Sequence, residues 1–524
     1  MKVVFVVTGV ESLAVEFLSS FLKSRGHLTE LVFDPTLFSS EAVNFSRLAK
    51  FFDTQKELAR EIVGKNPDLI GFSVLTINYR RALDIAREVK SLNKNIPIIF
   101  GGIHPTCVPD VVIKQKDIDM VCVGEGEYAM DELLESFERK EKRDDIKNIW
   151  FKKGKKVIRN TCRRLIEDLD SLPFPDKEMF YKVYPGFVKD DYYALSSRGC
   201  PFSCTYCANN VLARVYKGLG KSLRRRSPKN IVDELALAKK KYSPKQITFV
   251  DDVFVQDITW LKDFVHRYKK RVNLPYVMLT HPRFVDYQVA KLLADSGCFL
   301  LMLGIQSASE ETRLKVLKRF ETNKEIEKAA EDCHRAGLKF SIDHIFNIPG
   351  DGIKKYEEAI KFYNKLRPAI INSYWLQYFP GTEIIGTAIK KGLMKKSQVR
   401  RIEEGLTSTS WVVGLGGRDT FNPELIYTNF QLLFTLLPVL PKWLMDKIIE
   451  RRIYLAKLKP PILLNTGLKF IVNLINGRGG IYLGIIKNIL HFAGTNLILK
   501  YRYKFASSRI VCFFEDKKLP GKCF

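Results

Sequence analysis

The stretch SSRGCPFSCTYCANN, residues 196–210, places three cysteines on one short loop. Their spacing, C-x3-C-x2-C, keeps Cys200, Cys204 and Cys207 within reach of one another. Ten cysteines scattered over 524 residues do not form a disulfide framework, and in such a chain a clustered trio indicates a metal site. Because the strand pattern YYALSS runs into this loop, we expect it at the carboxyl end of a β-strand, where parallel α/β folds carry their chemistry.

The number of available ligands distinguishes two kinds of metal centre. A structural zinc ion is normally closed by four ligands in tetrahedral geometry. The next thiols, Cys298 and Cys333, are remote in sequence, so His266 or His281 would have to complete a zinc set. A [4Fe–4S] cluster fits three cysteines better, because three irons are held by thiolates and the fourth stays open. An open iron can bind a small molecule and pass an electron to it.

The segment 191–400 repeats a strand–helix unit, and helical patterns such as 230–242 and 286–297 separate its strands. Six units, without eight, predict a partial (β/α)6 barrel whose functional loops lie at the carboxyl ends of the strands. The strand patterns are YYALSS (192–197), QITFV (246–250), YVMLT (276–280), FLLMLGI (299–305), KFSIDHIF (339–346) and INSYWLQ (371–377).

Residues 1–145 also alternate strand and helix patterns, with helices expected over 13–26, 78–92 and 127–138. The strands are short and rich in β-branched residues, as in a sheet that is buried on both faces. This order predicts an α/β domain with an open, doubly wound, Rossmann-like parallel sheet. The strand patterns are KVVFVV (2–7), TELVF (29–33), DLIGFSV (68–74), IPIIF (96–100) and DMVCV (119–123).

The rest of the chain is less regular. Residues 146–190 form a basic, proline-containing stretch that we interpret as a linker, and residues 401–524 as a mostly helical C-terminal extension. Apolar stretches in the extension are interrupted by Lys and Arg. This pattern favours a helical cap over the barrel mouth, or an interfacial helix set with Trp443, Tyr454 and Tyr482 at the lipid surface. No run of 18 apolar residues predicts a transmembrane helix.

The formal net charge of +27 is unevenly distributed. Residues 1–145 carry 19 Lys and Arg against 23 Asp and Glu, whereas residues 400–524 carry 19 against 8. A basic middle and tail are typical of proteins that meet nucleic acid, a lipid surface or a phosphorylated substrate, and equally of a solvated lysine-rich surface. Without a secretory signal pattern, we expect a cytoplasmic protein, with peripheral contact at the inner face of the membrane as an option.

The sequence RGCPFSCTYC resembles the signature of the radical S-adenosylmethionine (radical SAM) enzymes. The resemblance implies a [4Fe–4S] cluster on the three cysteines, S-adenosylmethionine on the open iron, and reductive cleavage to a 5′-deoxyadenosyl radical. It also implies an electron donor of the flavodoxin or ferredoxin type. HIFNIPGD resembles the family's fifth-strand turn, with Asn347 where glycine is common and Asp351 where Glu is common. The candidate S-adenosylmethionine residues are Tyr206, Asp251, Asp252, Gln306 and Arg319.

The glycine-containing loops of residues 1–145, followed by such a barrel, resemble the cobalamin-binding domain of class B radical SAM enzymes. The resemblance covers about residues 1–400 and implies cobalamin as a third cofactor. The D-x-H-x-x-G cobalt-ligand motif is absent, so we predict a lower axial position without a protein histidine, and His104 as a loop-capping residue. No G-x-G-x-x-G fingerprint indicates a nicotinamide site. The candidate cobalamin residues are Gly9, Ser73, Thr76, Gly101, Gly102, His104, Gly124, Glu125 and Gly126.

These resemblances predict a methyltransferase that acts on an unactivated carbon of a hydrophobic, lipid-like substrate. The alternatives are ring closure or oxidation without methyl transfer, an RNA methylthiotransferase, and a non-catalytic cobalamin-binding protein. A methylthiotransferase would use the basic charge on RNA, but residues 1–145 contain only Cys107 and Cys122 instead of a second cysteine triad. Nucleic acid is therefore not the expected partner. The cysteine trio argues against the non-catalytic alternative.

Overall fold

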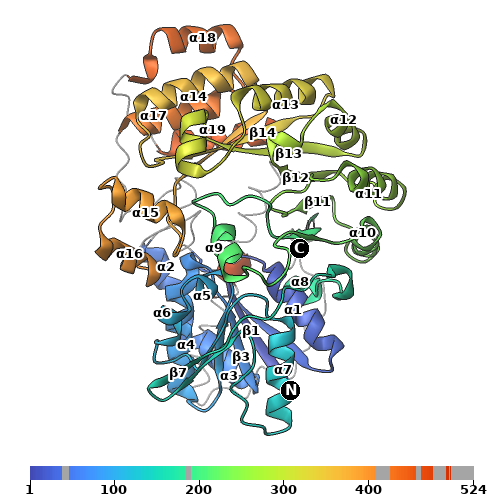
Figure 1. Ribbon diagram of the computed structural model, residues 1–524, viewed down its shortest axis with the longest axis vertical. Helices are drawn as coiled ribbons and strands as arrows, with labels where there is room; N and C mark the ends of the chain where they lie inside the picture. Colours follow the sequence, from blue (N-terminus) through green and yellow to red (C-terminus); the bar gives the residue numbers. More distant parts are fainter. Residues whose placement is uncertain are drawn as a thin grey trace.

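The computed structural model describes residues 1–37, 46–183, 190–406, 425–455, 462–475, 491–494 and 496. Two parallel sheets dominate the described chain, one in the N-terminal region and one in the middle region (Figure 1). The segment that contains the three cysteines and helix α9 (Ala208–Val215) lies between them in this view (Figure 1). The α/β class expected from the sequence is confirmed.

The N-terminal sheet has the strand order β2-β1-β3-β4-β5-β6-β7, in which the first five strands are parallel. The chain leaves β1 toward β2 on one side and returns to β3 on the other, so the strand order reverses at β1 and β3. Open sheets of this kind bind ligands outside the carboxyl ends of the strands at this switch point. The five parallel strands lie where the sequence predicts them: β1 Lys2–Thr8, β2 Leu28–Asp34, β3 Leu69–Ser73, β4 Ile98–Gly101 and β5 Met120–Cys122.

Helices cover both faces of this sheet, which explains its continuous apolar strands. Along β1, Val3, Phe5 and Val7 join one core cluster, and Val4 and Val6 join another on the opposite face. Helices α1 and α7 supply the first cluster, and α3 and α4 supply the second. The helices of this region are α1 Leu13–Ser24, α2 Ser46–Phe51, α3 Gln55–Gly64, α4 Tyr79–Leu92, α5 Ile103–Cys107, α6 Pro109–Ile113 and α7 Glu127–Glu138.

The stretch 146–190, which the sequence indicated as an irregular linker, begins with a β-hairpin. Strands β6 (Ile149–Lys153) and β7 (Lys156–Arg159) pair antiparallel with each other, and β6 pairs antiparallel with β5. This part of the stretch therefore completes the N-terminal sheet. It is followed by the short helix α8 (Lys177–Tyr181), and the domain limits remain predictions.

The middle region forms a second parallel sheet with the order β15-β14-β13-β12-β11-β8, which is the chain order. Within the described ranges, β8 and β15 do not pair, so the sheet is a partial barrel of six strands as predicted. A large cluster, which includes Tyr192, Phe249 and Tyr276, packs the sheet against its outer helices. The strands are β8 Asp191–Ala194, β11 Gln246–Phe249, β12 Tyr276–Thr280, β13 Cys298–Gln306, β14 Phe340–Phe346 and β15 Ile370–Trp375. The helices are α10 Pro228–Tyr242, α11 Ile258–Arg271, α12 Tyr287–Asp295, α13 Asn323–Arg335 and α14 Ile353–Leu366.

The loop that carries the cysteines is closed at its base by a two-stranded antiparallel ladder. Strand β9 (Ser197–Arg198) pairs with β10 (Arg224–Arg225), with Arg198 opposite Arg224. The 25 residues between these strands, 199–223, therefore project as one loop from the carboxyl end of the barrel. We call this segment the cysteine loop.

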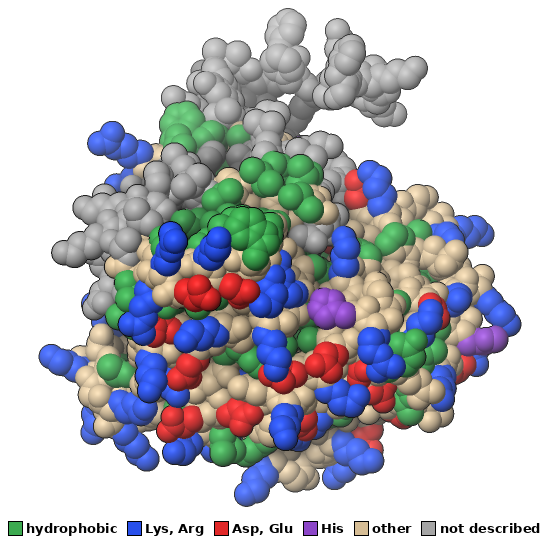
Figure 2. Space-filling view, turned by 90° about the horizontal axis from the view of Figure 1, so that it is seen from above, with side chains coloured by type: hydrophobic (Ala, Val, Ile, Leu, Met, Phe, Trp, Pro, Cys, Tyr) green, Lys and Arg blue, Asp and Glu red, His purple; other side chains and the backbone are tan. Residues whose placement is uncertain are grey.

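The described part of the C-terminal extension is helical, as the sequence predicts. Its helix α17 packs on β15 and α14, so this helix covers the outer face of the barrel and not its mouth, where the cap was expected. Trp443 is 61% exposed, Tyr454 is buried, and Tyr482 lies outside the described residues. Figure 2 shows hydrophobic side chains gathered at this end of the molecule, bordered by Lys and Arg together with Asp and Glu. None of the helices in the described ranges is long and apolar enough to cross a membrane. The helices of the extension are α17 Leu425–Leu436, α18 Lys442–Glu450 and α19 Ile462–Ile475. Helix α15 Glu383–Lys390 precedes the extension, and α16 Lys396–Glu403 crosses its predicted start at residue 401.

Candidate active site

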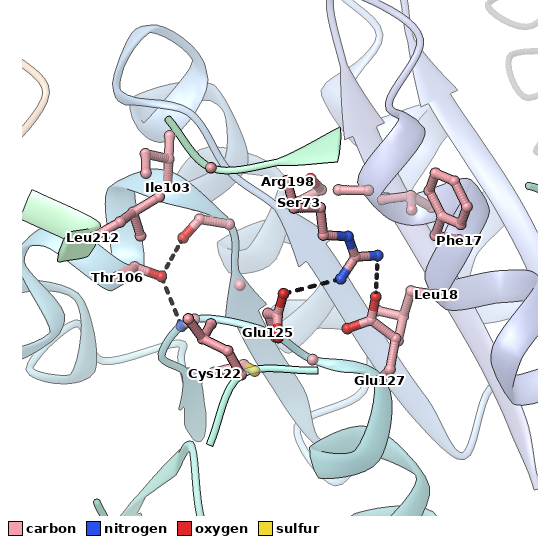
Figure 3. A pocket seen from close by; sticks show the side chains of 18 of the residues that line it. Phe17, Leu18, Ser73, Ile103, Thr106, Cys122, Glu125, Glu127, Arg198 and Leu212 are labelled. Atoms are coloured by element: carbon pink, nitrogen blue, oxygen red, sulfur yellow. Dashed lines mark hydrogen bonds and ion pairs between the residues drawn. The ribbon is translucent and has the colours of Figure 1, made fainter. Parts of the chain in front are cut away.

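A cavity of about 400 Å³ lies between the carboxyl ends of the two sheets (Figure 3). Ser73, at the end of β3, and Gly102, after β4, contribute to its wall from the N-terminal domain. Cys200 and Asp252 contribute from the barrel. Most of the remaining wall is apolar and includes Phe17, Leu18, Ile103 and Leu212. Residues predicted for different cofactors therefore face one shared space.

The cysteine loop is pinned to the segment that follows β13. Thr205 donates its backbone N–H to the carbonyl of Leu317 at 3.1 Å and its hydroxyl to the carbonyl of Val316 at 2.7 Å. The backbone N–H of Cys207 returns to the carbonyl of Cys204 at 3.1 Å. Residues Thr312–Leu317 form a short π-helical turn, a feature frequent at functional sites. These backbone contacts fix the loop without using a thiol.

The three thiols do not form a mononuclear metal site. Tetrahedral zinc with bonds of about 2.3 Å would bring its sulfurs to within about 4 Å of one another. Among the residues that the structure describes, no group of three or more His, Cys, Asp or Glu side chains is arranged to hold one metal ion. A cluster separates its thiolates further because each binds a different iron. Three thiols without a fourth protein ligand match the open cluster that the sequence predicts.

Of the two histidines considered as a fourth zinc ligand, one lies on an outer helix and the other is engaged within the barrel. His266 is exposed on α11, an outer helix of the barrel. His281 is buried, with Nε2 at 3.1 Å from Glu321 and Nδ1 accepting from the backbone N–H of Arg283. Its ring also stacks on Phe202 of the cysteine loop at 4.2 Å. Neither histidine closes the cysteine set.

Burial keeps these thiols protonated until metal binds. It raises the pKa of Cys200 to about 12 and that of Cys207 to about 11. Burial also raises the pKa of Cys204, but the guanidinium of Arg319, with Nη1 at 3.7 Å from Sγ, acts in the opposite direction. Because coordinated thiols are deprotonated, iron binding at this loop must release protons.

Arg319 is buried. Besides the Cys204 contact, it donates to the carboxylate of Glu321 at 2.7 Å and to the carbonyl of Gly304. Arg319 therefore contacts the Sγ of Cys204 from outside the cavity wall. Whether it also meets the methionine carboxylate remains a prediction.

The two predicted carboxylates at the end of β11 have different surroundings. Asp251 is buried and accepts hydrogen bonds from the backbone N–H and hydroxyl of Ser196, so it ties the end of β8 to β11. Asp252 lines the cavity, where loss of surrounding water raises the pKa of its carboxyl group. Of the pair, Asp252 is placed to meet a cofactor, whereas Asp251 organises the strand ends.

The other predicted barrel residues lie outside the cavity wall. Tyr206 packs in an apolar cluster with Leu317 and Leu376. Gln306 ends β13 with φ +70°, where the register with β14 shifts. Asn347 has φ +65°, and asparagine is one of the few residues besides glycine that adopts this left-handed conformation readily. The departure from glycine at Asn347 therefore preserves the turn.

Six of the nine predicted cobalamin residues line the cavity. Gly102 has φ +104°, and a Cβ there would lie 2.8 Å from the carbonyl oxygen of Val74. Only glycine lets the chain pass at this point and leave its backbone open to a large ligand. The six residues are Ser73, Gly101, Gly102, Gly124, Glu125 and Gly126.

Gly9, Thr76 and His104 do not line this cavity. His104 is fully buried, with Nδ1 at 3.1 Å from the hydroxyl of Thr76 and its ring at 4.2 Å from that of Tyr79. Burial lowers its pKa to about 4, so the ring is neutral at pH 7. The imidazole thus packs outside the cavity wall, against Thr76 and Tyr79, in accord with the capping role.

Several residues of the site were not singled out from the sequence. The hydroxyl of Thr106 bridges the loops after β4 and β5, donating to the carbonyl of Gly102 at 2.8 Å and accepting from the N–H of Gly124 at 2.9 Å (Figure 3). Arg198 could have been found from the sequence, because it is the first residue of the RGCP motif that contains Cys200. It binds Glu125 at 3.1 Å and Glu127 at 2.6 Å (Figure 3).

Arg224 and Tyr216 had no signal in the sequence, because their partners are remote along the chain. Arg224 donates to the same Glu125 carboxylate at 2.7 Å. The hydroxyl of Tyr216 accepts from the backbone N–H of Glu125 at 2.6 Å. Both residues connect the barrel side of the cavity to the N-terminal domain.

Comparisons with known proteins agree with both halves of this site. Residues 10–134 match the family model of the B12 binding domain, and residues 195–363 match that of the radical SAM superfamily. The first range contains the loops at the carboxyl ends of the N-terminal sheet. The second contains the cysteine loop and four strands of the barrel, β11 to β14.

Two curated relatives illustrate the range of this similarity. The chain is 27% identical to an uncharacterized methyltransferase of Pyrococcus horikoshii, over 65% of this chain and 73% of that protein. It is 25% identical to the anaerobic magnesium-protoporphyrin IX monomethyl ester cyclase of Rubrivivax gelatinosus, over 70% of this chain and 64% of that protein.

A solved structure shares the fold over nearly the whole chain. The cobalamin-dependent S-adenosylmethionine radical enzyme OxsB, with aqua-cobalamin and S-adenosylmethionine bound, aligns with a TM-score of 0.62 at 16% identity. The alignment covers 97% of this chain and 84% of OxsB. At this identity the likeness establishes the fold.

Fold, cysteine loop and glycine-lined cavity together define an enzyme that holds two large cofactors between two parallel sheets. The chain belongs to the cobalamin-binding-domain-containing radical SAM enzymes, the family that the cysteine motif and the glycine-containing loops together indicated. Membership of this family carries three cofactors: a [4Fe–4S] cluster, S-adenosylmethionine and cobalamin. Cys200, Cys204 and Cys207 would hold the cluster, and the glycine-containing loops would hold cobalamin.

Proposed function

We propose that the chain methylates an unactivated carbon of a hydrophobic, lipid-like substrate. The observation that carries the proposal is the shared cavity, in which Cys200 and Asp252 face Ser73 and the glycine loops across a mostly apolar wall. When bound, the cluster with S-adenosylmethionine supplies a radical that abstracts hydrogen from carbon, and methylcobalamin supplies a methyl group. The radical and the methyl group can both reach one carbon only if the two cofactor sites open to the same space.

The chain's own residues position these groups and exclude water. The pinned cysteine loop holds the three cysteines in place, and Asp252 presents a carboxylate to the cavity. Apolar side chains such as Phe17, Ile103 and Leu212 keep the space dry. A dry cavity protects a reactive carbon from side reactions and favours an apolar substrate.

Ring closure without methyl transfer is the second candidate, because one relative of similar identity is a cyclase. Both reactions begin with the same hydrogen abstraction, so the cavity alone does not separate them. A flavodoxin- or ferredoxin-type electron donor and contact with an anionic membrane surface remain predictions.

Anaerobic reconstitution with cobalamin, dithionite and methyl-labelled S-adenosylmethionine tests the proposal. Incubated with a total lipid extract from the cells that produce the chain, the enzyme should form 5′-deoxyadenosine and transfer label to a lipid one CH₂ unit heavier. The Cys207→Ala variant is the control and should do neither. Label found only in peptide or nucleic acid would overturn the substrate class, and 5′-deoxyadenosine without label transfer would favour the cyclase.

A further inference from the structure

Four charged residues join the cysteine loop to the cobalamin-binding domain. Arg198 and Arg224 come from the ladder at the base of the cysteine loop, and Glu125 and Glu127 come from the loop after β5 and the start of α7. We propose that these four residues form an interdomain latch that fixes the cysteine loop against the cobalamin-binding loop and thereby sets the spacing of the two cofactor sites. The proposal rests on the two sites and holds whichever substrate or outcome the enzyme has.

The base of the cysteine loop needs a partner from the other domain. Arg198 and Arg224 are directly opposite in an antiparallel pair, so their side chains share a face, and like charges in this arrangement repel. One carboxylate oxygen of Glu125 lies between them, at 3.1 Å from Arg198 and 2.7 Å from Arg224. The ladder therefore closes without repulsion only when the N-terminal domain is docked.

The set is electrically balanced and mostly removed from water. Arg198 completes it by binding Glu127 at 2.6 Å, which gives two positive and two negative groups. The four side chains are between 6% and 17% exposed. A buried charge that loses its partner is strongly destabilising, so the docked arrangement is sharply favoured over a separated one.

Close packing at two glycines surrounds the latch. A Cβ at Gly199 would lie 2.0 Å from the carbonyl oxygen of Ser222, and one at Gly124 would lie 1.8 Å from the hydroxyl of Tyr216. The second carboxylate oxygen of Glu125 accepts from the backbone N–H of Ile166 at 2.9 Å. Because Arg198 is two residues before Cys200, a shift of the latch would move the first cluster ligand.

Hydrogen exchange of the full chain without cofactors tests the latch directly. Glu127→Gln removes one arm, and exchange in residues 122–130, 196–200 and 222–226 should accelerate about 30-fold or more, the cost of unpairing a buried charge. Glu135→Gln, which removes an exposed ion pair from the same helix, is the control and should leave these segments unchanged. Arg198→Lys keeps the charge but not the two-carboxylate fork and should lie between. Unchanged exchange in both latch variants, or a rise spread evenly over the whole chain, would overturn the latch.

A second measurement separates positioning from stability alone. In reconstituted protein, pulsed electron paramagnetic resonance can measure the distance between cob(II)alamin and the reduced cluster. Glu127→Gln and Arg198→Lys should broaden or lengthen this distance, whereas Glu135→Gln should match the unmodified chain. An unchanged distance distribution in both latch variants would refute the positioning role. Since no substrate is present, the result does not depend on the proposed methyl transfer.

Discussion

The two parallel sheets of this enzyme prepare their cofactor sites in different ways. The barrel uses side-chain chemistry, with three thiols on a loop that Thr205 pins to the segment after β13. The N-terminal sheet uses backbone shape, with glycines at positive φ in the loops after β4 and β5. A cluster site therefore depends on a few ligand atoms, which single substitutions can remove. A non-covalent site for a large cofactor depends instead on whether the backbone of its loops can pass without steric clash.

The largest effect is expected from the thiols. Cys204→Ala removes a ligand that no nearby side chain replaces, so the cluster should not assemble and 5′-deoxyadenosine formation should fall at least about 1,000-fold. Iron analysis and absorption spectra of anaerobically reconstituted protein check this. Cys162→Ser, whose thiol donates to the carbonyl of Val123 at 3.7 Å and lies outside the cysteine loop, should keep full iron. Bound cobalamin should be unaffected, and a Cys204→Ala protein with a complete cluster would contradict the barrel side of the comparison.

A matched pair of glycine substitutions should separate the two sites. Gly199→Ala forces a Cβ against Ser222 in the cysteine loop, and Gly102→Ala forces one against Val74 beneath the cobalamin loop, both at positive φ. Each should lower the free energy of unfolding by about 2–3 kcal/mol. The first should mainly reduce iron content, and the second should mainly reduce cobalamin content.

The control for this pair is Gly64→Ala, at the end of α3 with no atom within 4 Å of the added Cβ and no positive φ. It should leave stability, iron and cobalamin as they are. Denaturant titration together with both cofactor assays makes the comparison. Equal loss of both cofactors in both variants would show that the sheets do not divide the work as proposed.

Much of the fold could be predicted because strand and helix patterns are local. The apolar, β-branched runs of both sheets appear where the sequence placed them. The hairpin of β6 and β7 was missed because its basic residues and Gly154 resemble an exposed connector. Only pairing with β5 identifies it as part of the sheet.

The candidate site was predictable to the extent that it depends on chemistry rather than on tertiary contacts. The cysteines and loop glycines can be recognised in the sequence by residue type and spacing. The link from Glu125 to Arg224 joins residues 99 positions apart, so no local pattern could reveal it. His104 has the residue type of a metal ligand, but its burial against Tyr79 is a property of the fold.

A smaller effect is expected from Arg319. Its N–H near the Sγ of Cys204 should stabilise the more negative, reduced cluster, because hydrogen bonds to cluster sulfurs raise the reduction potential. Arg319→Lys keeps the charge but loses the planar donor set, so the potential should fall by on the order of 60 mV. A redox titration followed by electron paramagnetic resonance measures it, with Lys318→Arg as the neighbouring control. An unchanged potential would mean that the contact does not act on the cluster.

The smallest effect is expected from His104, and it tests the backbone-based side of the comparison most directly. Because its imidazole is buried against Thr76 and Tyr79, outside the cavity wall, His104→Leu should change cobalamin affinity by no more than about twofold. The lost hydrogen bond should lower the free energy of unfolding by about 1 kcal/mol. Cobalamin titration and the electron paramagnetic resonance spectrum of bound cob(II)alamin are the measurements. The spectrum should show no histidine nitrogen coupled to cobalt before or after the substitution. If such a coupling is present and disappears in His104→Leu, a protein side chain binds cobalt just as cysteine side chains bind iron. The contrast between the two sheets would then fail.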